Sequence, residues 1–172
     1  MFQALCLIVI ALLAVIDQLI KIIMEVWLKP IGSSGVIKGF ISFAYLQNRG
    51  AAFGVLQNGT VILSIITFIV IIAGIYLVAF NKIKSKFECI SISLVISGGL
   101  GNLIDRVFRG YVVDFIKTDF MDFPVFNFAD CLITVGACML VGYLIYSLIK
   151  EYKEKKENSA VKTDGEAEKT DG

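Results

Sequence analysis

The feature that most constrains the fold is a run of 20 residues without a charged side chain, from Val61 to Phe80. A helix of about 20 apolar residues is long enough to cross the ~30 Å hydrocarbon core of a membrane. Three further apolar runs accompany it, and the hydrophobic content of 57% lies outside the range of soluble globular proteins. The sequence therefore predicts a mainly α membrane protein with four transmembrane helices, at about residues 4–24, 61–80, 89–106 and 126–149.

The distribution of lysines predicts the orientation of these helices. The loop from Asn81 to Glu88 carries three lysines, and cytoplasmic loops of membrane proteins are enriched in Lys and Arg. Four spans then place both termini in the cytoplasm. We expect a membrane domain at 1–149 and a charged tail at 150–172 that extends the last helix and becomes disordered. Because the first apolar run has no basic residue before it and no small-residue cleavage site after it, we expect an uncleaved span.

A segment of different character, at about residues 25–60, separates the first two spans. The turn signal Gly32–Gly35 precedes a run from Val36 to Gln47 with rough period-two alternation of apolar residues. This pattern predicts a small extracytoplasmic β element after the first span. Its apolar composition indicates contact with the membrane surface, with Trp27 and Tyr45 as interfacial anchors.

The residue types that are missing restrict the possible chemistry. The chain contains no histidine, which excludes a histidine-activated Ser or Cys nucleophile and an HExxH zinc site. The positive charges form no basic face, so nucleic acid is not a predicted partner. Four cysteines lie in apolar runs without a Cys-x-x-Cys pair, and we expect them to pack as small apolar residues: Cys6, Cys89, Cys131 and Cys138.

Two aspartates, Asp114 and Asp130, lie in apolar surroundings beside the ends of the last two spans. An ionisable side chain there raises the free energy of the folded protein unless it is paired or hydrated, so its presence indicates a functional role. The segment between them begins and ends on one side of the membrane, so we expect the two carboxyls to reach in from neighbouring helices and meet. A pair that shares one proton is the arrangement of an aspartyl protease, which requires no metal or cofactor. Asp119 and Asp122, between them, are expected to be solvated surface charges.

Other interpretations of these acids stay open at this point. A proton-coupled transporter or channel subunit would use Asp17, Asp114 and Asp130 as a relay, although a relay needs acids spread through the depth of the bilayer. The Gly-x-Gly-Asp signature of presenilin-type proteases is missing. Asp130, three residues after Asn127, also fits a helix cap. The apolar run that precedes Asp130 instead places it inside the helix.

Further polar residues share helix faces. Asp17 and Lys21 are four residues apart and either end the first span as an ion pair or line a site. Gly98, Asn102 and Arg106 recur every four residues. Gly98 suits close helix packing, whereas Asn102 can bind a neighbouring loop or a substrate carbonyl. Arg106 either orients a carboxylate or phosphate or extends to the membrane surface.

Taken together, these motifs resemble the lipoprotein signal peptidases, also called signal peptidase II. The resemblance covers nearly the whole chain up to Ile149, with five motifs in the order of the family: DQLIK at Asp17–Lys21, NRGAAFG at Asn48–Gly54, GGLGNLIDR at Gly98–Arg106, GYVVDF at Gly110–Phe115 and FNFAD at Phe126–Asp130. It implies that Asp114 and Asp130 are the catalytic dyad of an intramembrane aspartyl protease. It also implies a supporting set that consists of Asp17, Lys21, Asn48, Gly54, Gly98, Asn102, Arg106, Asn127 and Ala129.

The same resemblance implies the biological setting. The segment 25–60 is similar to the β-cradle and flap of the family. The implied substrate is a prolipoprotein that carries diacylglycerol on a cysteine and is cut just before that cysteine, with globomycin as an inhibitor. The implied location is the bacterial plasma membrane, with the active site near the outer leaflet, among membrane lipids, in a protein expected to be a monomer. Phe123 stands where many members have a larger aromatic residue, and the charged tail is outside the shared pattern.

Overall fold

The computed structural model describes residues 1–50, 59–83 and 85–167 of the 172-residue chain. Its elements follow in the order α1 (Phe2–Leu28), β1 (Ser33–Ile37), β2 (Ile41–Asn48), α2 (Thr60–Ala79), α3 (Lys86–Arg109), β3 (Val112–Thr118) and α4 (Phe128–Ala167). Within the described ranges, four helices are long and apolar enough to cross a membrane. The predicted class, a multi-pass helical membrane protein with a small antiparallel sheet, is confirmed.

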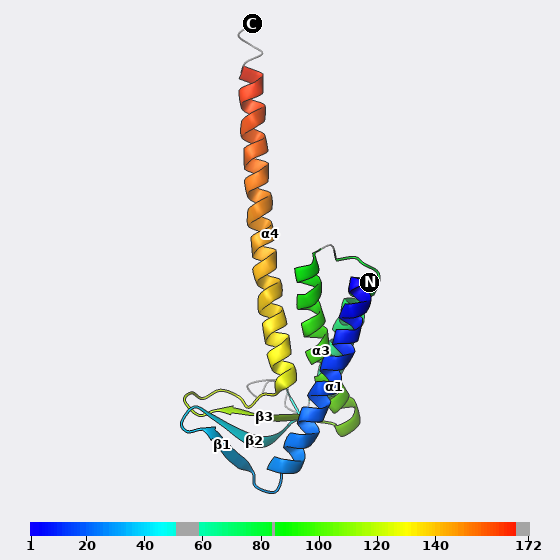
Figure 1. Cartoon of the computed structure of the whole chain (residues 1–172), viewed down its shortest axis with the longest axis vertical. Helices are drawn as coiled ribbons and strands as arrows, with labels where there is room; N and C mark the ends of the chain where they lie inside the picture. Colours follow the sequence, from blue (N-terminus) through cyan, green and yellow to red (C-terminus); the bar gives the residue numbers. More distant parts are fainter. Residues whose placement is uncertain (51–58, 84, 168–172) are drawn as a thin grey trace.

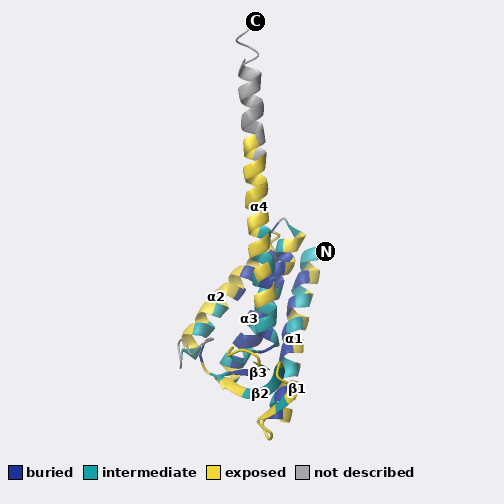
Figure 2. Ribbon diagram, turned by 90° about the vertical axis from the view of Figure 1, so that its left-hand side faces the viewer, coloured by how far each residue is buried: buried dark blue, intermediate teal, exposed yellow. Residues whose placement is uncertain are grey.

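The sheet lies at one end of the helix bundle, where α1 ends and α4 begins, and the N terminus lies at the other end (Figure 1). α3 is the central helix and packs against α1, α2 and α4. Figure 2 shows that burial is concentrated along α3, whereas α2 and α4 have largely exposed outer faces. These outer faces are apolar, with Val61 of α2 70% exposed, as expected for helices that contact lipid.

Several helix boundaries differ by a few residues from the sequence prediction. α1 continues to Leu28, so Trp27 belongs to this helix and not to the β element, because no helix-breaking residue precedes Pro30. α4 begins at Phe128 rather than near Phe126, and residues 150–167 of the charged tail extend this helix. The disorder expected for the end of the tail stays a prediction.

The sheet contains one strand that the sequence analysis did not predict. β1 and β2 form an antiparallel hairpin with Gly39 at a positive φ of 72°, the left-handed conformation that glycine adopts most easily. β3 follows α3, far along the chain, and pairs antiparallel with β2 so that Leu46 faces Asp114. Its buried residues run consecutively from Val112 to Phe115. The VVDF motif therefore lies in a buried edge strand of the sheet, in contact with α1 and α3.

Two apolar clusters hold the elements together. The larger lies among α1, α2 and α3 and includes Cys6 and Cys89, whose sulfur atoms are 3.5 Å apart as free thiols. The smaller fixes the sheet on the helices and centres on Leu28 and Phe115, both almost fully buried. The packing role expected for the cysteines holds for this buried pair. Cys131 is instead half-buried and Cys138 is exposed.

Candidate active site

Asp114 lies on β3, with only 1% of its surface exposed. Its two oxygens each accept a hydrogen bond from an asparagine amide. Asn48 Nδ2 donates to Oδ2 at 2.9 Å, and Asn127 Nδ2 donates to Oδ1 at 2.6 Å. The expectation that both candidate acids project from helices is therefore wrong for Asp114. Because β3 pairs with β2, the strand register places the carboxyl beside Asn48, the last residue of β2.

Asp130 lies in the first turn of α4, which begins at Phe128. Asn127 Oδ1 accepts the backbone N–H of Asp130 at 3.0 Å, and Asp130 Oδ2 accepts the backbone N–H of Asn127 at 3.1 Å. This reciprocal pair is a capping box. Asp130 therefore lies inside the helix, as the apolar run predicted, but in its first turn, where it also takes part in the cap that begins at Asn127. The other oxygen, Oδ1, accepts a hydrogen bond from Asn102 Nδ2 at 2.8 Å.

A short backbone bridge brings the two acids together. Ile116 N–H donates to Phe126 O at 2.7 Å, and Phe126 N–H donates to Ile116 O at 3.0 Å. The segment after β3 is thereby closed into a loop that returns the chain to Asp114. Asn127 then contacts both acids, Asp114 through its side chain and Asp130 through its backbone. The predicted convergence of the two carboxyls is present, and Asn127 joins them.

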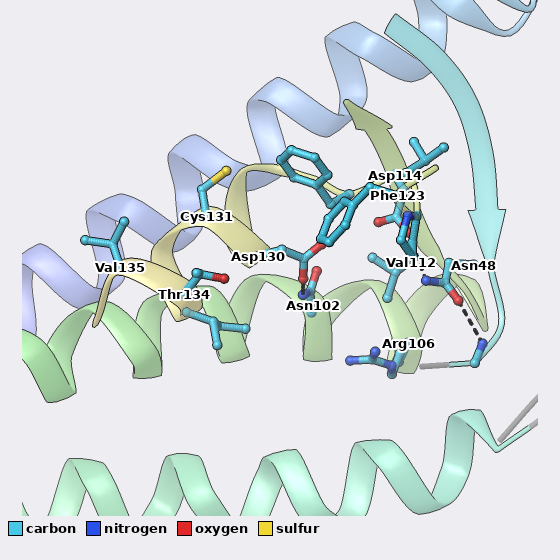
Figure 3. Close-up of a pocket in the computed structure, with 15 residues that line it drawn as sticks. Asn48, Asn102, Arg106, Val112, Asp114, Phe123, Asp130, Cys131, Thr134 and Val135 are labelled. Atoms are coloured by element: carbon cyan, nitrogen blue, oxygen red, sulfur yellow. Dashed lines mark hydrogen bonds between the residues drawn. The ribbon is translucent and has the colours of Figure 1, made fainter. Parts of the chain in front are cut away.

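Both carboxyls face one cavity of about 560 Å³. Figure 3 shows Asp114 projecting from β3 and Asp130 from α4, with Asn102 and Arg106 projecting from α3. Arg106 is half-buried and lines the cavity, so it belongs to the site rather than to the outer surface. The remaining wall is mainly apolar and includes Val112, Phe123, Pro124, Val125, Phe126, Cys131, Ile133 and Val135.

The surroundings of Asp114 favour its protonated form. Burial raises the pKa of this carboxyl to about 6, and the nearby Asp130 raises it as well. The hydrogen bonds from Asn48 and Asn127 act in the opposite direction, because they stabilise the charged form. Asp114 therefore keeps its proton to a higher pH than an ordinary carboxyl does.

A second polar cluster lies behind the cavity and is completely buried. Lys21 Nζ lies 2.9 Å from Asp17 Oδ2 and 3.1 Å from Asp105 Oδ2, and all three side chains are 0% exposed. The same ammonium donates to Asn102 Oδ1 at 2.8 Å. Of the two interpretations of the Asp17–Lys21 pair, an exposed end of the span is therefore excluded. The pair supports the site through Asn102 and does not line the cavity.

Asp105 is the member of this cluster that the sequence analysis missed. It lies three residues after Asn102 on α3, so both project toward α1. That spacing, next to Arg106, was the available signal. Asp105 Oδ2 also accepts the backbone N–H of Val113 at 3.2 Å. The residue therefore ties α1, α3 and β3 together immediately before Asp114.

A third polar set, also missed, attaches the sheet to the helices. Glu25 of α1 accepts hydrogen bonds from Tyr45 Oη at 2.9 Å and from Arg109 Nη1 at 2.5 Å. Arg109 Nε also lies 3.5 Å from Asp105 Oδ1. Tyr45, expected as an interfacial anchor, thus contacts α1 directly. These contacts fix β2, which carries Asn48, relative to α1 and α3.

Small residues permit the close contact between α3 and its neighbours. A Cβ atom at Gly98 would lie 2.2 Å from the carbonyl oxygen of Ala129, and one at Gly101 would lie 2.3 Å from Asp17 Oδ2. Ala129 is fully buried, and its backbone N–H donates to Asp17 Oδ1 at 3.0 Å. Gly98 and Ala129 therefore position the first turn of α4. Gly54 lies outside the described residues, as does the rest of 51–58 within the segment expected to form the β-cradle and flap.

Asp119 and Asp122 lie outside the cavity lining and are exposed. Asp119 accepts a hydrogen bond from Ser42 Oγ at 2.9 Å. Among residues 1–50, 59–83 and 85–167, no group of three or more Cys, Asp or Glu side chains is arranged to hold a metal ion.

Comparison with known proteins identifies the family to which this site belongs. The family model for signal peptidase (SPase) II matches residues 9–146. The chain belongs to the signal peptidase II family. This membership confirms the predicted resemblance and makes the protein an aspartic-type peptidase.

Individual members of the signal peptidase II family cover most of the chain. A lipoprotein signal peptidase of Caldanaerobacter subterraneus subsp. tengcongensis is 46% identical over 139 residues, which are 80% of this chain and 93% of that protein. One from Clostridium novyi is 42% identical over 138 residues, or 76% of this chain and 90% of that protein. A solved bacterial membrane enzyme is 36% identical with a TM-score of 0.76, and the match covers 88% of this chain and 92% of that one.

Proposed function

We propose that this signal peptidase II is an intramembrane aspartyl endopeptidase that removes signal peptides from diacylglyceryl-modified prolipoproteins. Asp114 and Asp130 are its catalytic dyad, and the bond cut is the one before the lipid-modified cysteine. The observation that carries this proposal is the convergence of both carboxyls on one cavity, joined through Asn127. Family membership supports the substrate class.

The geometry supports a division of roles between the two acids. Asp114 is the more deeply buried, and because its pKa is raised to about 6, it keeps its proton to a higher pH than an ordinary carboxyl. Asp130 is half-buried and accepts two N–H hydrogen bonds, which stabilise a carboxylate. Asp130 thus acts as the base and Asp114 as the acid, while the pair as a whole titrates in macroscopic steps.

The reaction then proceeds without a covalent intermediate. Asp130 takes a proton from a water molecule as the water oxygen attacks the scissile carbonyl carbon. The proton on Asp114 forms a hydrogen bond to the developing oxyanion, which lowers the energy of the tetrahedral intermediate. When the C–N bond breaks, a proton passes to the departing amine, and the dyad returns to one shared proton. Arg106, on the same cavity wall, provides a fixed positive charge near both carboxyls.

The cavity wall suits a substrate that is partly lipid. Its apolar residues include Ile133 and Val135 on the membrane-spanning part of α4. The cavity wall therefore extends toward the region of the membrane that acyl chains occupy. The carboxyls belong to β3 and to the first turn of α4, which lie together at the end of the bundle that carries the sheet (Figure 1). With both termini in the cytoplasm of a bacterial cell, that end faces the outer leaflet of the plasma membrane. A monomer contains every residue of the proposed site.

A proton relay is not favoured by the placement of the acids. Asp17, Asp105, Asp114 and Asp130 are connected by short contacts and therefore occupy one level of the bundle. A relay would need groups distributed along the membrane normal.

Timed processing by the purified protein tests the proposal. A peptide that carries a signal sequence and a diacylglyceryl-modified cysteine is incubated with the protein in lipid–detergent micelles, and the products are identified by mass spectrometry. We expect one cut, immediately before the modified cysteine, and inhibition by globomycin. A matched peptide with an unmodified cysteine should remain intact. A cut at another bond, or equal processing of the two peptides, would contradict the proposed specificity.

A further inference from the structure

Three asparagine amides surround the two carboxyls, and the oxygen of each amide is held by a donor. The donor is a backbone N–H for two of them and an ammonium for the third. Their donor–acceptor pairs are Gly50 N to Asn48 Oδ1 at 2.9 Å, Asp130 N to Asn127 Oδ1 at 3.0 Å, and Lys21 Nζ to Asn102 Oδ1 at 2.8 Å. Each amide therefore turns its Nδ2 side toward the dyad, as Figure 3 shows for Asn48 and Asn102.

The orientation of Asn102 is decided by Lys21. The two ends of an asparagine amide have nearly the same shape, so only the hydrogen-bond partners determine which end faces which neighbour. An ammonium group donates and cannot accept. The oxygen of Asn102 must therefore face Lys21, and its Nδ2 is left to donate to Asp130 Oδ1 at 2.8 Å. Asn127 Nδ2 also donates to Asn102 Oδ1, at 3.2 Å, and favours the same orientation.

Lys21 has no further proton for any other role. An ammonium carries three protons, and three acceptors surround it: Asp17 Oδ2, Asp105 Oδ2 and Asn102 Oδ1. Two carboxylates balance its charge, and Arg109 Nε lies 3.5 Å from Asp105 Oδ1. Lys21 is fully buried and does not line the cavity. Its effect on Asp130 therefore passes through the amide of Asn102 rather than through direct contact.

We propose that Lys21 is a positioning residue that locks Asn102 with its amide nitrogen toward Asp130 and so maintains Asp130 as an ionised base. This inference rests on the proposed function, in which Asp130 accepts the proton of the attacking water. The charged and titratable groups around Asp130 are Asp114 from β3, Arg106 from α3, Cys131 from α4 and, behind Asn102 and Ala129, Lys21 and Asp17 from α1.

A double-mutant cycle separates this role from a simple effect of charge. The pH dependence of kcat/KM is measured for the wild type, Lys21→Met, Asn102→Ala and the double variant, all as purified full chains. Losing the hydrogen bond to the ionised Asp130 should shift the acid limb of the kcat/KM profile to higher pH by about 1–2 units in either single variant. In the Asn102→Ala background, Lys21→Met should shift that limb no further. If the shifts of the two single variants added in the double variant, the proposal would be overturned, because Lys21 would then act on Asp130 only through the electrostatic field of its charge.

Two other variants keep the test decisive if Lys21→Met does not fold. The double variant Lys21→Met/Asp105→Asn removes one charge of each sign. Its acid limb should shift to higher pH by as much as that predicted for Lys21→Met alone. Asn102→Asp retains an acceptor for Lys21 but places an oxygen opposite Asp130, so the acid limb should shift to higher pH by more than in Asn102→Ala. Each variant is checked for a wild-type elution profile and unfolding temperature in detergent. A folded Asn102→Asp variant with an unchanged acid limb would overturn the proposal.

The outcome distinguishes this inference from the proposed function. If the wild type cleaves the lipid-modified peptide and Asp130→Asn does not, the proposed function stands whatever the cycle shows. Lys21→Arg adds a further control, because a guanidinium also donates without accepting. A folded Lys21→Arg variant should keep the acid limb close to that of the wild type. A shift as large as that of Lys21→Met would contradict the orienting role.

Discussion

The protein contains two groups of acids that lie one asparagine apart and differ in almost every physical respect. In the closed group, Asp17 and Asp105 hold the ammonium of Lys21, and none of these side chains has any exposed surface. In the open pair, Asp114 and Asp130 face a cavity of about 560 Å³, and the hydrogen bonds that they receive from the described part of the chain come from neutral N–H donors.

This difference explains why similar residues have different tasks. A buried carboxylate with a cation in hydrogen-bonding contact is already neutralised, and removing either partner leaves an uncompensated charge in the interior. Two carboxyls without a cation in hydrogen-bonding contact share a proton instead, which keeps one basic and one acidic. The closed group thus stabilises the fold, and the open pair is available for chemistry. Asn102 connects them, because it accepts from Lys21 and donates to Asp130.

The largest effect on activity is expected from the open pair. Asp114→Asn and Asp130→Asn should each reduce cleavage of the lipid-modified peptide by about a thousandfold or more, because a neutral amide can neither take nor supply the proton. Both variants should remain folded in detergent, because the removed repulsion between the carboxyls offsets the one accepting oxygen that each substitution loses. Cleavage at the wild-type rate by either variant would show that the open pair is not the dyad.

The largest effect on stability is expected from the closed group. Asp17→Ala leaves Lys21 with one carboxylate fewer and removes the acceptor of the Ala129 N–H. The cost should be about 3–5 kcal/mol in the free energy of unfolding, measured by thermal or denaturant unfolding in detergent. If this variant proved as stable as the wild type but inactive, the two groups would not divide stability and chemistry as described.

Two glycines of α3 probe the groups separately through packing. Gly101→Ala places a methyl group against Asp17 of the closed group, whereas Gly98→Ala places one against Ala129 in the helix turn that carries Asp130. Each should destabilise the protein by about 1–3 kcal/mol. Gly98→Ala should also lower kcat among the molecules that remain folded. Gly142→Ala on α4 is the matched control, because its Cβ would have no neighbour within 4 Å, and it should unfold no earlier than the wild type.

A smaller effect is expected from a donor to the open pair. Asn48 Nδ2 stabilises the charged form of Asp114 and so lowers its pKa. Asn48→Ala removes this donor, so the pKa of Asp114 rises and the alkaline limb of the kcat/KM profile should move to higher pH. The acid limb, which reports on Asp130, should move less. A shift of the alkaline limb to lower pH would contradict the assignment of Asp114 as the proton donor.

The smallest effect is expected from an acid in neither group. Asp119 is exposed and accepts a hydrogen bond from Ser42 on the neighbouring strand. Asp119→Asn should change cleavage by less than about twofold, because exposed hydrogen bonds and ion pairs contribute little. A loss comparable to that of Asp114→Asn, in the same timed assay, would mean that the wrong acid of the loop was assigned to the dyad.

Much of this site was predictable from the sequence, because its signals are local. Val61–Phe80 is recognisable as a span from hydropathy alone, and Asp114 and Asp130 stand out as acids in apolar runs. Asp105 did not stand out, although it lies in the same motif as Arg106, since its location at the end of a span suits an exposed charge equally well. Only its 3.1 Å distance to Lys21 and its complete burial reveal its role.

The sequence by itself determined the four apolar helices, the family motifs and the identity of the candidate acids, because each depends on composition and spacing within a few turns of helix. Tertiary structure alone decided that Asp114 lies on a strand opposite Leu46, that Asp130 belongs to a capping box, and that Lys21 contacts Asn102. The reason is physical. Strand register, the start of a helix and burial depend on contacts between residues distant in the chain. The energies of these contacts cannot be recognised from neighbouring residues in the sequence.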